Sequence, residues 1–296
     1  MDKQIKEKYK LSQEEHERIS KQIKQELFNN VSKQENPISI IVGGQPGSGK
    51  GAVISYSKNQ CEQKGRSSII ITTDEYKPYH PDSIEVAKKY PTEYVEIIEQ
   101  DAGLWTGEML KHAIDNKYNF IFEGTLKNDR ILERIKELKQ NGFYVIVRAL
   151  AVPRMESLIA IHERYENQIE NMGWGRLISI EHHNTAYDNI PQVIDTIEKS
   201  GLCTVEIFKR GKKINQPQRV YSSKIDKKIY PTARVALEEY RELETFKTQL
   251  TAKSRIEKLK DAFLNRNATN KEMQQLDELE DYMRMICMDN SNEITK

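Results

Sequence analysis

A glycine-rich segment ending in a lysine is the part of this 296-residue sequence with the clearest chemical meaning. Residues Gly43–Gly51 read Gly-Gly-Gln-Pro-Gly-Ser-Gly-Lys-Gly and follow the largely apolar, β-branched run Ile38–Val42. Glycines let the backbone turn tightly and direct its N–H groups inward, and such a nest at a helix N-terminus binds phosphate. A strand, this turn and a helix in that order predict a P-loop, in which Lys50 would reach the β- and γ-phosphates of a nucleotide.

The whole turn and the residues at its end are the predicted nucleotide contacts. They are Gly44, Gln45, Pro46, Gly47, Ser48, Gly49, Lys50 and Gly51. The usual pattern places Ser or Thr after the lysine, with its hydroxyl on Mg²⁺, whereas Gly51 stands there in this chain. This Lys-Gly pair resembles adenylate kinases, in which the metal is held largely through water. The departure therefore favours a small-molecule kinase, and an ordinary glycine turn is the alternative interpretation.

Two carboxylates follow predicted strands. Asp74 comes after the run at 67–72, and Glu123 comes after the run at 118–122. In open α/β sheets ligands bind at the carboxyl ends of the strands. Asp74 could take a proton from an acceptor hydroxyl or hold Mg²⁺ through water, and Glu123 could bind the metal or the acceptor. The structural alternatives are a helix N-cap for Asp74 and a turn cap for Glu123.

Two arginines follow later in the chain. Arg164 lies on a helix expected at 154–170, outside its apolar stripe, and Arg176 lies in the glycine-containing loop after it. A planar guanidinium suits phosphate oxygens, so both could close over a γ-phosphate, although surface ion pairs are the alternative. The adjacent pair His182 and His183 does not predict a metal site, because neighbouring side chains on a helix diverge by about 100°.

The remaining pattern predicts the scaffold that holds these residues. Strands at 38–42, 67–72, 118–122, 143–152 and 203–209 alternate with helices, which predicts an α/β fold with a mostly parallel sheet between helix layers. Before them, Ser12 and Glu15 form a capping box for an amphipathic helix. We expect an N-terminal helical segment at 1–35, a P-loop kinase core at 36–215 and a mainly helical extension at 216–296, with a small hairpin within 210–230.

Composition narrows the possible partners. The chain has 46 basic and 45 acidic residues, a net charge of +1, so no basic field predicts nucleic acid or a membrane surface as partner. No apolar run approaches the roughly 20 residues of a membrane span. The three cysteines, Cys61, Cys203 and Cys287, are widely spaced, which suits a reducing cytoplasm.

Taken in order, the motifs resemble one family, the zeta toxins of bacterial toxin–antitoxin systems. The resemblance covers roughly residues 36–210 and is carried by GGQPGSGK at 43–50, TTDEYKPYHPD at 72–82, FEGT at 122–125, AVP at 151–153, ERYE at 163–166 and Arg176. Zeta toxins are kinases that use ATP and Mg²⁺ to phosphorylate the 3′-hydroxyl of the amino sugar of UDP-N-acetylglucosamine, which inhibits cell-wall synthesis.

The resemblance implies a role for each matching residue. Lys50 would bind phosphate, Asp74 would be the base, and Arg164 and Arg176 would clamp the phosphate being transferred. The implied substrate contacts are Glu123, Thr125, Glu108 and His80. A small helical antitoxin that covers the nucleotide site is the implied partner, and inhibition by the chain's own helix at 12–30 is the less favoured alternative to ordinary packing of that helix.

The segment leading to residue 110 matches zeta toxins specific for UDP-sugars poorly. Another UDP-sugar, a nucleotide or a nicotinamide cofactor therefore remains an alternative acceptor. A nucleotide-binding regulator without catalysis is a further alternative, although such a regulator would need neither a base nor a clamp.

Overall fold

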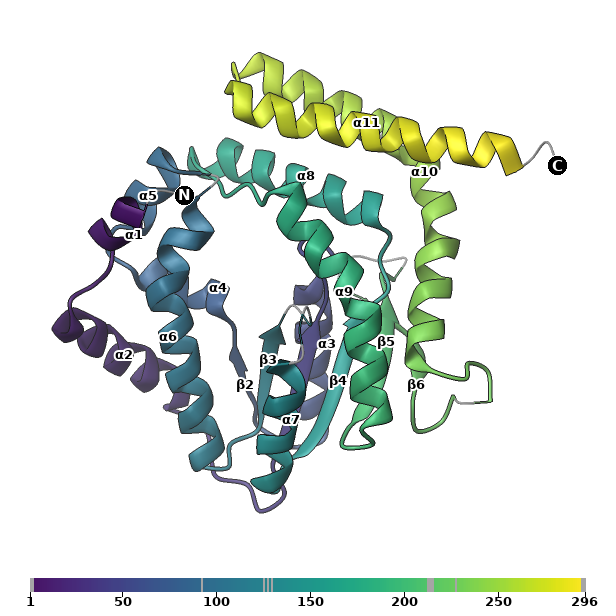
Figure 1. The fold of residues 1–296 in the computed structure, drawn as a ribbon. Coiled ribbons are helices and arrows are strands. Elements are labelled where there is room, and N and C mark those ends of the chain that lie inside the picture. Colours follow the sequence, from purple (N-terminus) through teal and green to yellow (C-terminus); the bar gives the residue numbers. More distant parts are fainter. Residues whose placement is uncertain are drawn as a thin grey trace.

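The computed structural model in Figure 1 describes residues 3–91, 93–124, 126, 128, 130–211, 216–226 and 228–293. In these residues a six-stranded sheet has the order β2-β3-β1-β4-β5-β6. All neighbouring strands are parallel except β6, which pairs antiparallel with β5. The predicted α/β class with a mostly parallel sheet is therefore confirmed. The strands are β1 (Ile38–Gly43), β2 (Ile69–Ile71), β3 (Phe120–Gly124), β4 (Tyr144–Leu150), β5 (Thr204–Lys209) and β6 (Gln218–Ser222).

Helices connect the parallel strands and extend the chain at both ends. The helices are α1 (Lys3–Lys8), α2 (Gln13–Phe28), α3 (Lys50–Glu62), α4 (Thr73–Tyr76), α5 (Ser83–Lys89), α6 (Tyr94–Asp115), α7 (Arg130–Gln140), α8 (Arg154–Met172), α9 (Ile180–Lys199), α10 (Ala233–Asn265) and α11 (Asn270–Glu293), with a 3₁₀ turn at Lys77–Tyr79. Several helices begin with an N-cap side chain that accepts a hydrogen bond from a backbone N–H of the first turn. In α2, Ser12 accepts from the Glu15 N–H, and in α10, Thr232 accepts from the Val235 N–H.

The alternation of side chains along β1 separates two helix layers. Ile40 and Val42 pack with Val53 of α3 on one face of the sheet. Ile41 faces the other side, where α6, α7 and α9 supply the apolar side chains of the larger core. Trp105 of α6 is fully buried in that core, and its indole N–H donates to the backbone carbonyl of His16 at 3.2 Å. The carboxyl ends of β1, β2 and β3 consequently lie along one edge, between the layers.

The N-terminal helix packs at the edge of this core. Ile19 and Ile23 of α2 are buried in the same cluster as Trp105 and Met109 of α6. This is the packing that the amphipathic pattern at 12–30 favours. None of the α2 residues belongs to the cavity described below.

At the other end, α10 and α11 cover α8 (Figure 1). The apolar cluster between them includes Leu158 and Ile161 of α8, Ile256 and Phe263 of α10 and Leu276 of α11. The sheet itself reaches into this part of the chain, because β6 at 218–222 forms the antiparallel pair with β5. Among the described residues no helix is both long enough and apolar enough to cross a membrane.

Candidate active site

The turn between β1 and α3 has the conformation that a phosphate-binding loop needs. Gly47 (φ +74°) and Gly49 (φ +92°) lie in the left-handed region that favours glycine. A Cβ on Gly47 would also stand 2.1 Å from the Ser157 carbonyl oxygen at the start of α8. Lys50 begins α3 and folds back over the turn, donating to the carbonyl oxygens of Gly44 at 3.1 Å and Gln45 at 3.4 Å. An anionic ligand could therefore meet the lysine and the turn together.

The side chains of two residues in this turn are buried inside the protein, although both residues were predicted as nucleotide contacts. The Gln45 side chain is fully buried and donates to the Val152 carbonyl at 2.9 Å and the Ser157 hydroxyl at 3.2 Å. The Ser48 side chain is also fully buried, and its hydroxyl has no hydrogen-bond partner among the described residues. Neither residue lines the cavity described next, so their side chains are not in the place of nucleotide contacts.

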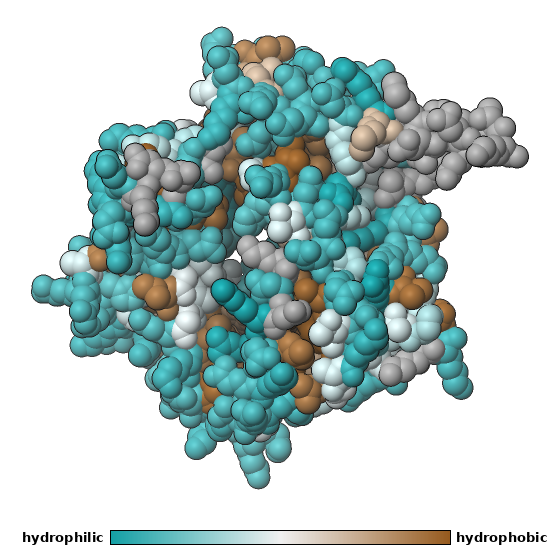
Figure 2. All heavy atoms as spheres, in the orientation of Figure 1, coloured by the Kyte–Doolittle hydropathy of each residue, from teal (hydrophilic) through white to brown (hydrophobic). Residues whose placement is uncertain are grey.

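A cavity of about 310 Å³ opens in front of the turn. Figure 2 shows the molecule hollowed near the centre of the face where α6, α8 and α9 meet. The lining residues with ionisable side chains are Lys50, Asp74, Lys77, Glu99, Glu123, Arg164, Arg176 and His182. Residues far apart in the sequence thus meet in one space, and the predicted set Lys50, Asp74, Glu123, Arg164 and Arg176 lies there together.

Asp74 lines this cavity, and a different residue caps its helix. Thr72 is the N-cap of α4, and its hydroxyl accepts from the Asp74 N–H at 3.3 Å. The alternative interpretation of Asp74 as the cap is therefore wrong. Arg176 donates to both carboxylate oxygens of Asp74, one contact being 2.6 Å, and the Lys77 ammonium lies 2.8 Å from the same carboxylate. Partial burial favours the protonated acid, but Arg176 and Lys77 outweigh it and hold the pKa of Asp74 well below its usual range.

Glu123 occupies the neighbouring strand end. It lies within β3, opposite Val42 of β1, so it is not the cap of a turn. Its carboxylate accepts from the Thr72 hydroxyl at 3.1 Å and lies 3.5 Å from the Lys50 ammonium. Burial lowers the pKa of Lys50, while the carboxylate of Glu123 opposes that shift.

Arg164 has buried guanidinium nitrogens on the cavity side of α8. Its Nε and Nη2 atoms are buried and have no hydrogen-bond partner in the described part of the chain. Burial, together with the positive charge of Arg176, lowers the pKa of Arg164 to about 10. A buried donor without an acceptor is unfavourable, and an anion in the cavity would supply the missing acceptor.

The loop after α8 brings Arg176 into the cavity. Gly173 ends the helix with φ +71°, and Gly175 packs so closely on the Tyr165 ring that a Cβ would stand 2.9 Å from it. The Arg176 N–H donates to the Gln168 side chain at 3.1 Å, which folds the loop back along α8. Trp174, in the same loop, lies against Tyr94 with 6.3 Å between the ring centroids.

Two predicted substrate contacts lie elsewhere, and a third is outside the described residues. Glu108 accepts from the Ser20 hydroxyl and lies 3.0 Å from the His16 ring on α2, so it holds the N-terminal helix and does not line the cavity. His80 is buried, with its Nε2 atom 3.0 Å from the Tyr9 carbonyl, and it anchors the same end of the chain. Thr125 lies outside the described residues.

Some cavity residues were missed by sequence reasoning. Lys77 was detectable, since it stands three residues after Asp74 and so on the same side of a helical turn. Glu99 had no such signal, because it comes from α6 and only the fold brings it to the cavity. His182 lines the cavity whereas His183 is buried with Nε2 2.8 Å from the Ser157 hydroxyl, so the two side chains do diverge.

The donor set is compatible with a water-mediated magnesium ion. Within the described ranges, no group of three or more His, Cys, Asp or Glu side chains could hold a metal by itself. Mg²⁺ in nucleotide sites is usually held by one or two carboxylates with phosphate and water. Asp74 and Glu123 both line the cavity with Lys50, and the Glu123 carboxylate lies 3.5 Å from the Lys50 ammonium, so two carboxylates are available beside the group that would bind phosphate.

The sequence is similar to one protein family and to several toxins. The sequence profile of the family described as "Zeta toxin" matches residues 21–225. Toxin zeta of Enterococcus hirae is 28% identical over 180 residues, which are 60% of this chain and 62% of that protein. Toxin PezT of Streptococcus pneumoniae serotype 4 is 26% identical over 201 residues, which are 67% of this chain and 76% of that protein.

A solved structure shares the fold. It is a chain reported for the PezAT chromosomal toxin–antitoxin system of Streptococcus pneumoniae, with a TM-score of 0.69 and 22% identity. The similarity covers 85% of this chain and 98% of that one. By contrast, the sequence match to the Enterococcus toxin spans less than two thirds of that protein's length.

Proposed function

The chain belongs to the zeta toxin family, and we propose on that basis that it is an ATP-dependent kinase of a small molecule with a hydroxyl acceptor. The observation that carries the proposal is the single cavity lined by Lys50, Asp74, Arg164 and Arg176. A kinase must bind the phosphates, neutralise charge on the group in transfer and orient the acceptor hydroxyl. The cavity contains a candidate group for each of these tasks.

The proposed reaction uses the residues as follows. The N–H groups of the P-loop and the Lys50 ammonium bind the β- and γ-phosphates, and Arg164 donates its unpartnered nitrogens to γ-phosphate oxygens. The acceptor oxygen attacks the γ-phosphorus, the bond from that phosphorus to the bridging oxygen of ADP breaks, and the hydroxyl proton passes to Asp74. Mg²⁺, held by Asp74 through water, would supply charge neutralisation at the phosphates when bound.

For the acceptor we propose the 3′-hydroxyl of the amino sugar of UDP-N-acetylglucosamine, with Glu123 and Thr125 as its contacts. The support for it is the family membership. Glu108 and His80 are left out, because both are engaged with the N-terminal helices. The alternatives are another UDP-sugar, a nucleotide or a nicotinamide cofactor.

We further propose a small helical antitoxin as partner, because a cytoplasmic kinase of a cell-wall precursor would harm its own host. Expression of the wild-type chain alone should stop bacterial growth, and expression of Lys50→Ala should not. If neither stops growth in any host tested, the toxin proposal fails and a metabolic kinase becomes the better interpretation.

The acceptor is tested by incubating the protein with γ-labelled ATP and Mg²⁺ and separately offering UDP-N-acetylglucosamine, UDP-glucose or a bacterial metabolite extract. Mass spectrometry then identifies the product that carries the label, and Lys50→Ala serves as the inactive control. Label on the amino sugar supports the proposal. Label only on another molecule would show that this molecule, and not UDP-N-acetylglucosamine, is the acceptor. If ATP binds but no acceptor is labelled, the chain is a nucleotide-binding regulator.

A further inference from the structure

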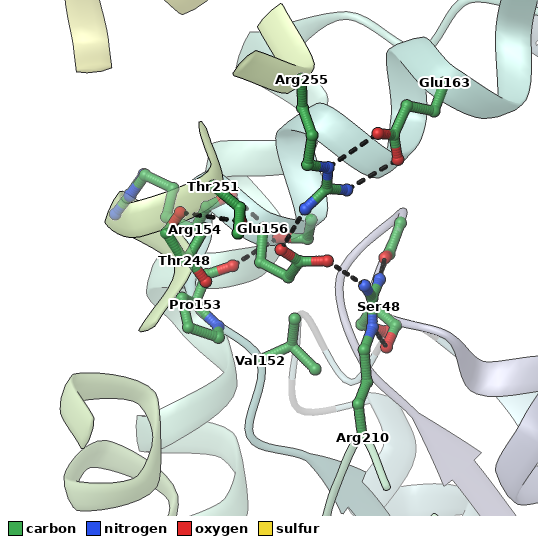
Figure 3. A network of polar contacts seen from close by, with 12 residues as sticks. Ser48, Val152, Pro153, Arg154, Glu156, Glu163, Arg210, Thr248, Thr251 and Arg255 are labelled. Atoms are coloured by element: carbon green, nitrogen blue, oxygen red, sulfur yellow. Dashed lines mark hydrogen bonds and ion pairs between the residues drawn. The ribbon is translucent and has the colours of Figure 1, made fainter. Parts of the chain in front are cut away.

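An arginine outside the cavity holds the back of the P-loop. Arg210 follows the last residue of β5, and its guanidinium donates to the Gly47 carbonyl at 2.5 Å and the Ser48 carbonyl at 3.4 Å. The third contact of this guanidinium is an ion pair with Glu156, in the first turn of α8. Figure 3 shows Arg210 reaching from β5 to both partners. One side chain thus joins the P-loop to the start of α8.

The Glu156 carboxylate also forms an ion pair with α10. Arg255 of α10 donates to the second oxygen of Glu156 at 2.5 Å. It also binds Glu163 through both carboxylate oxygens, at 2.7 and 2.6 Å (Figure 3). Glu156 and Glu163 are two turns apart on one side of α8, so Arg255 spans that length of the helix. We call the alternating series Arg210, Glu156, Arg255 and Glu163 the charge ladder.

Both ends of the charge ladder adjoin groups of the candidate site. At one end, Arg210 donates to the Ser48 carbonyl and so fixes the peptide plane between Ser48 and Gly49. In a trans peptide the Gly49 N–H points away from that carbonyl, and its direction is therefore fixed as well. At the other end, Glu163 directly precedes Arg164 on α8, so holding Glu163 limits rotation and sliding of the helix that carries Arg164.

A second contact from α10 supports the same connection. Arg241, buried at the other end of α10, donates to the side-chain oxygen of Gln45 at 3.3 Å, and Gln45 in turn holds Val152 and Ser157. The helix therefore reaches the P-loop through Arg241 and through the ladder. The family profile ends at residue 225, before α10 begins at Ala233.

We propose that α10 is a working part of the kinase site, in which Arg210 and Arg255 are positioning residues. Arg210 sets the direction of the P-loop N–H groups that bind ATP, and Arg255 sets the place of Arg164 by fixing α8. This inference rests on the proposed kinase function. It predicts that the two arginines affect different steps: Arg210 affects nucleotide binding and Arg255 affects phosphoryl transfer.

Docking of α10 on α8 does not depend on the ladder. The two helices share an apolar interface that includes Leu158, Ile161, Ile256 and Phe263, all of which are buried. Removing Arg255 should therefore leave α10 in place and change only the alignment of the charged groups. A structural role would instead lower thermal stability and leave the turnover of the folded protein unchanged.

The test compares Arg210→Gln and Arg255→Gln with the control Lys260→Gln in the full chain. Lys260 also lies on α10, but its partner at 2.9 Å is Glu280 of α11, away from the P-loop. Three quantities are measured: the Kd of a fluorescent ATP analogue, kcat and KM for transfer from ATP, and the melting temperature. The single variant Glu163→Gln and the double variant Glu163→Gln with Arg255→Gln complete a mutant cycle.

We expect Arg210→Gln to weaken ATP binding about 10-fold, as loss of charge-assisted hydrogen bonds commonly does. Arg255→Gln should lower kcat about 10-fold with the Kd for ATP changed less than about 2-fold, and adding Glu163→Gln should cost little more. Lys260→Gln should leave Kd and kcat unchanged. All melting temperatures should stay within about 4 °C of wild type.

Unchanged kcat in Arg255→Gln, or a loss fully explained by lower stability, would overturn the proposal. If wild type binds ATP but labels no acceptor, the kinase function fails on its own, and Arg210→Gln still decides through ATP affinity whether the ladder shapes the P-loop. A wild-type chain that does not bind ATP overturns both proposals.

Discussion

Arg176 donates hydrogen bonds to both carboxylate oxygens of Asp74, although the two residues are 102 positions apart in the chain. The ion pair joins the loop after α8 to the short helix α4, and both residues line the cavity. With its oxygens engaged in this way and by Lys77, Asp74 is ionised but is a weak acceptor of a further proton. A γ-phosphate would compete for Arg176, and loss of that partner would make the carboxylate more basic as the phosphoryl group arrives.

Asp74→Asn should retain ATP binding and lose phosphoryl transfer by about 10²-fold or more, because the amide cannot take up the proton. The matched control is Glu75→Gln, since Glu75 is the neighbouring acid on α4 and does not line the cavity. Kd for ATP and single-turnover rates are measured for both variants. Near-normal transfer in Asp74→Asn would rule out the base.

Arg176→Gln should make transfer more sensitive to acid. In the wild type the lowered pKa keeps Asp74 ionised as the pH falls, and without Arg176 that pKa rises, so the base is protonated at a higher pH. The ion pair of Asp74 with Arg176 also contributes to the free energy of unfolding. This contribution is fully present above the pKa that Asp74 has in the unfolded chain, and it is lost as the pH falls toward the lower pKa of Asp74 in the folded chain. The ratio of variant to wild-type kcat/KM, followed below about pH 5, cancels the titration of ATP itself. A ratio independent of pH would contradict the prediction.

Lys50→Ala should lower transfer by about 10²-fold or more, because a charge contact that acts in the transition state disappears. The fold should survive, since among the described residues the polar partners of the Lys50 ammonium are the carbonyl groups of its own turn and the carboxylate of Glu123. Circular dichroism and the melting temperature provide the control. Unchanged turnover in a folded variant would refute the kinase assignment.

Arg164→Met should have opposite effects on activity and stability. Transfer should fall about 10²-fold. The free energy of unfolding without nucleotide should rise by about 1 kcal/mol, because the variant removes two buried donor nitrogens that have no partner among the residues the structure describes. Denaturant unfolding with and without ATP separates the two effects. A variant that is destabilised without ATP would show that Arg164 serves packing.

The sequence was sufficient to predict that residues at the carboxyl ends of strands would meet, because these ends share one edge of a parallel sheet. Asp74 and Glu123 were found in this way, and Lys50 through its motif. It was insufficient for Glu108, which the family resemblance implied as a substrate contact but which holds α2, and for Gln45, whose side chain turns inward. Arg210 and Arg255 could not be recognised either, because their partners lie 54 to 163 residues away and depend on how α8 and α10 pack.

The chain contains two tryptophans, and their positions give it a built-in optical signal. Trp105 is sealed in the core, so its emission should stay constant while the fold is intact. Trp174 is only partly buried and stands two residues before Arg176, against Tyr94. If ATP draws Arg176 away from Asp74, the surroundings of Trp174 change and its fluorescence should shift, in the unlabelled protein and within the time of mixing. Asp74→Ala lacks the ion pair with Arg176, so ATP should cause a smaller change of fluorescence in this variant. The movement of the loop can then be timed separately from the chemical step.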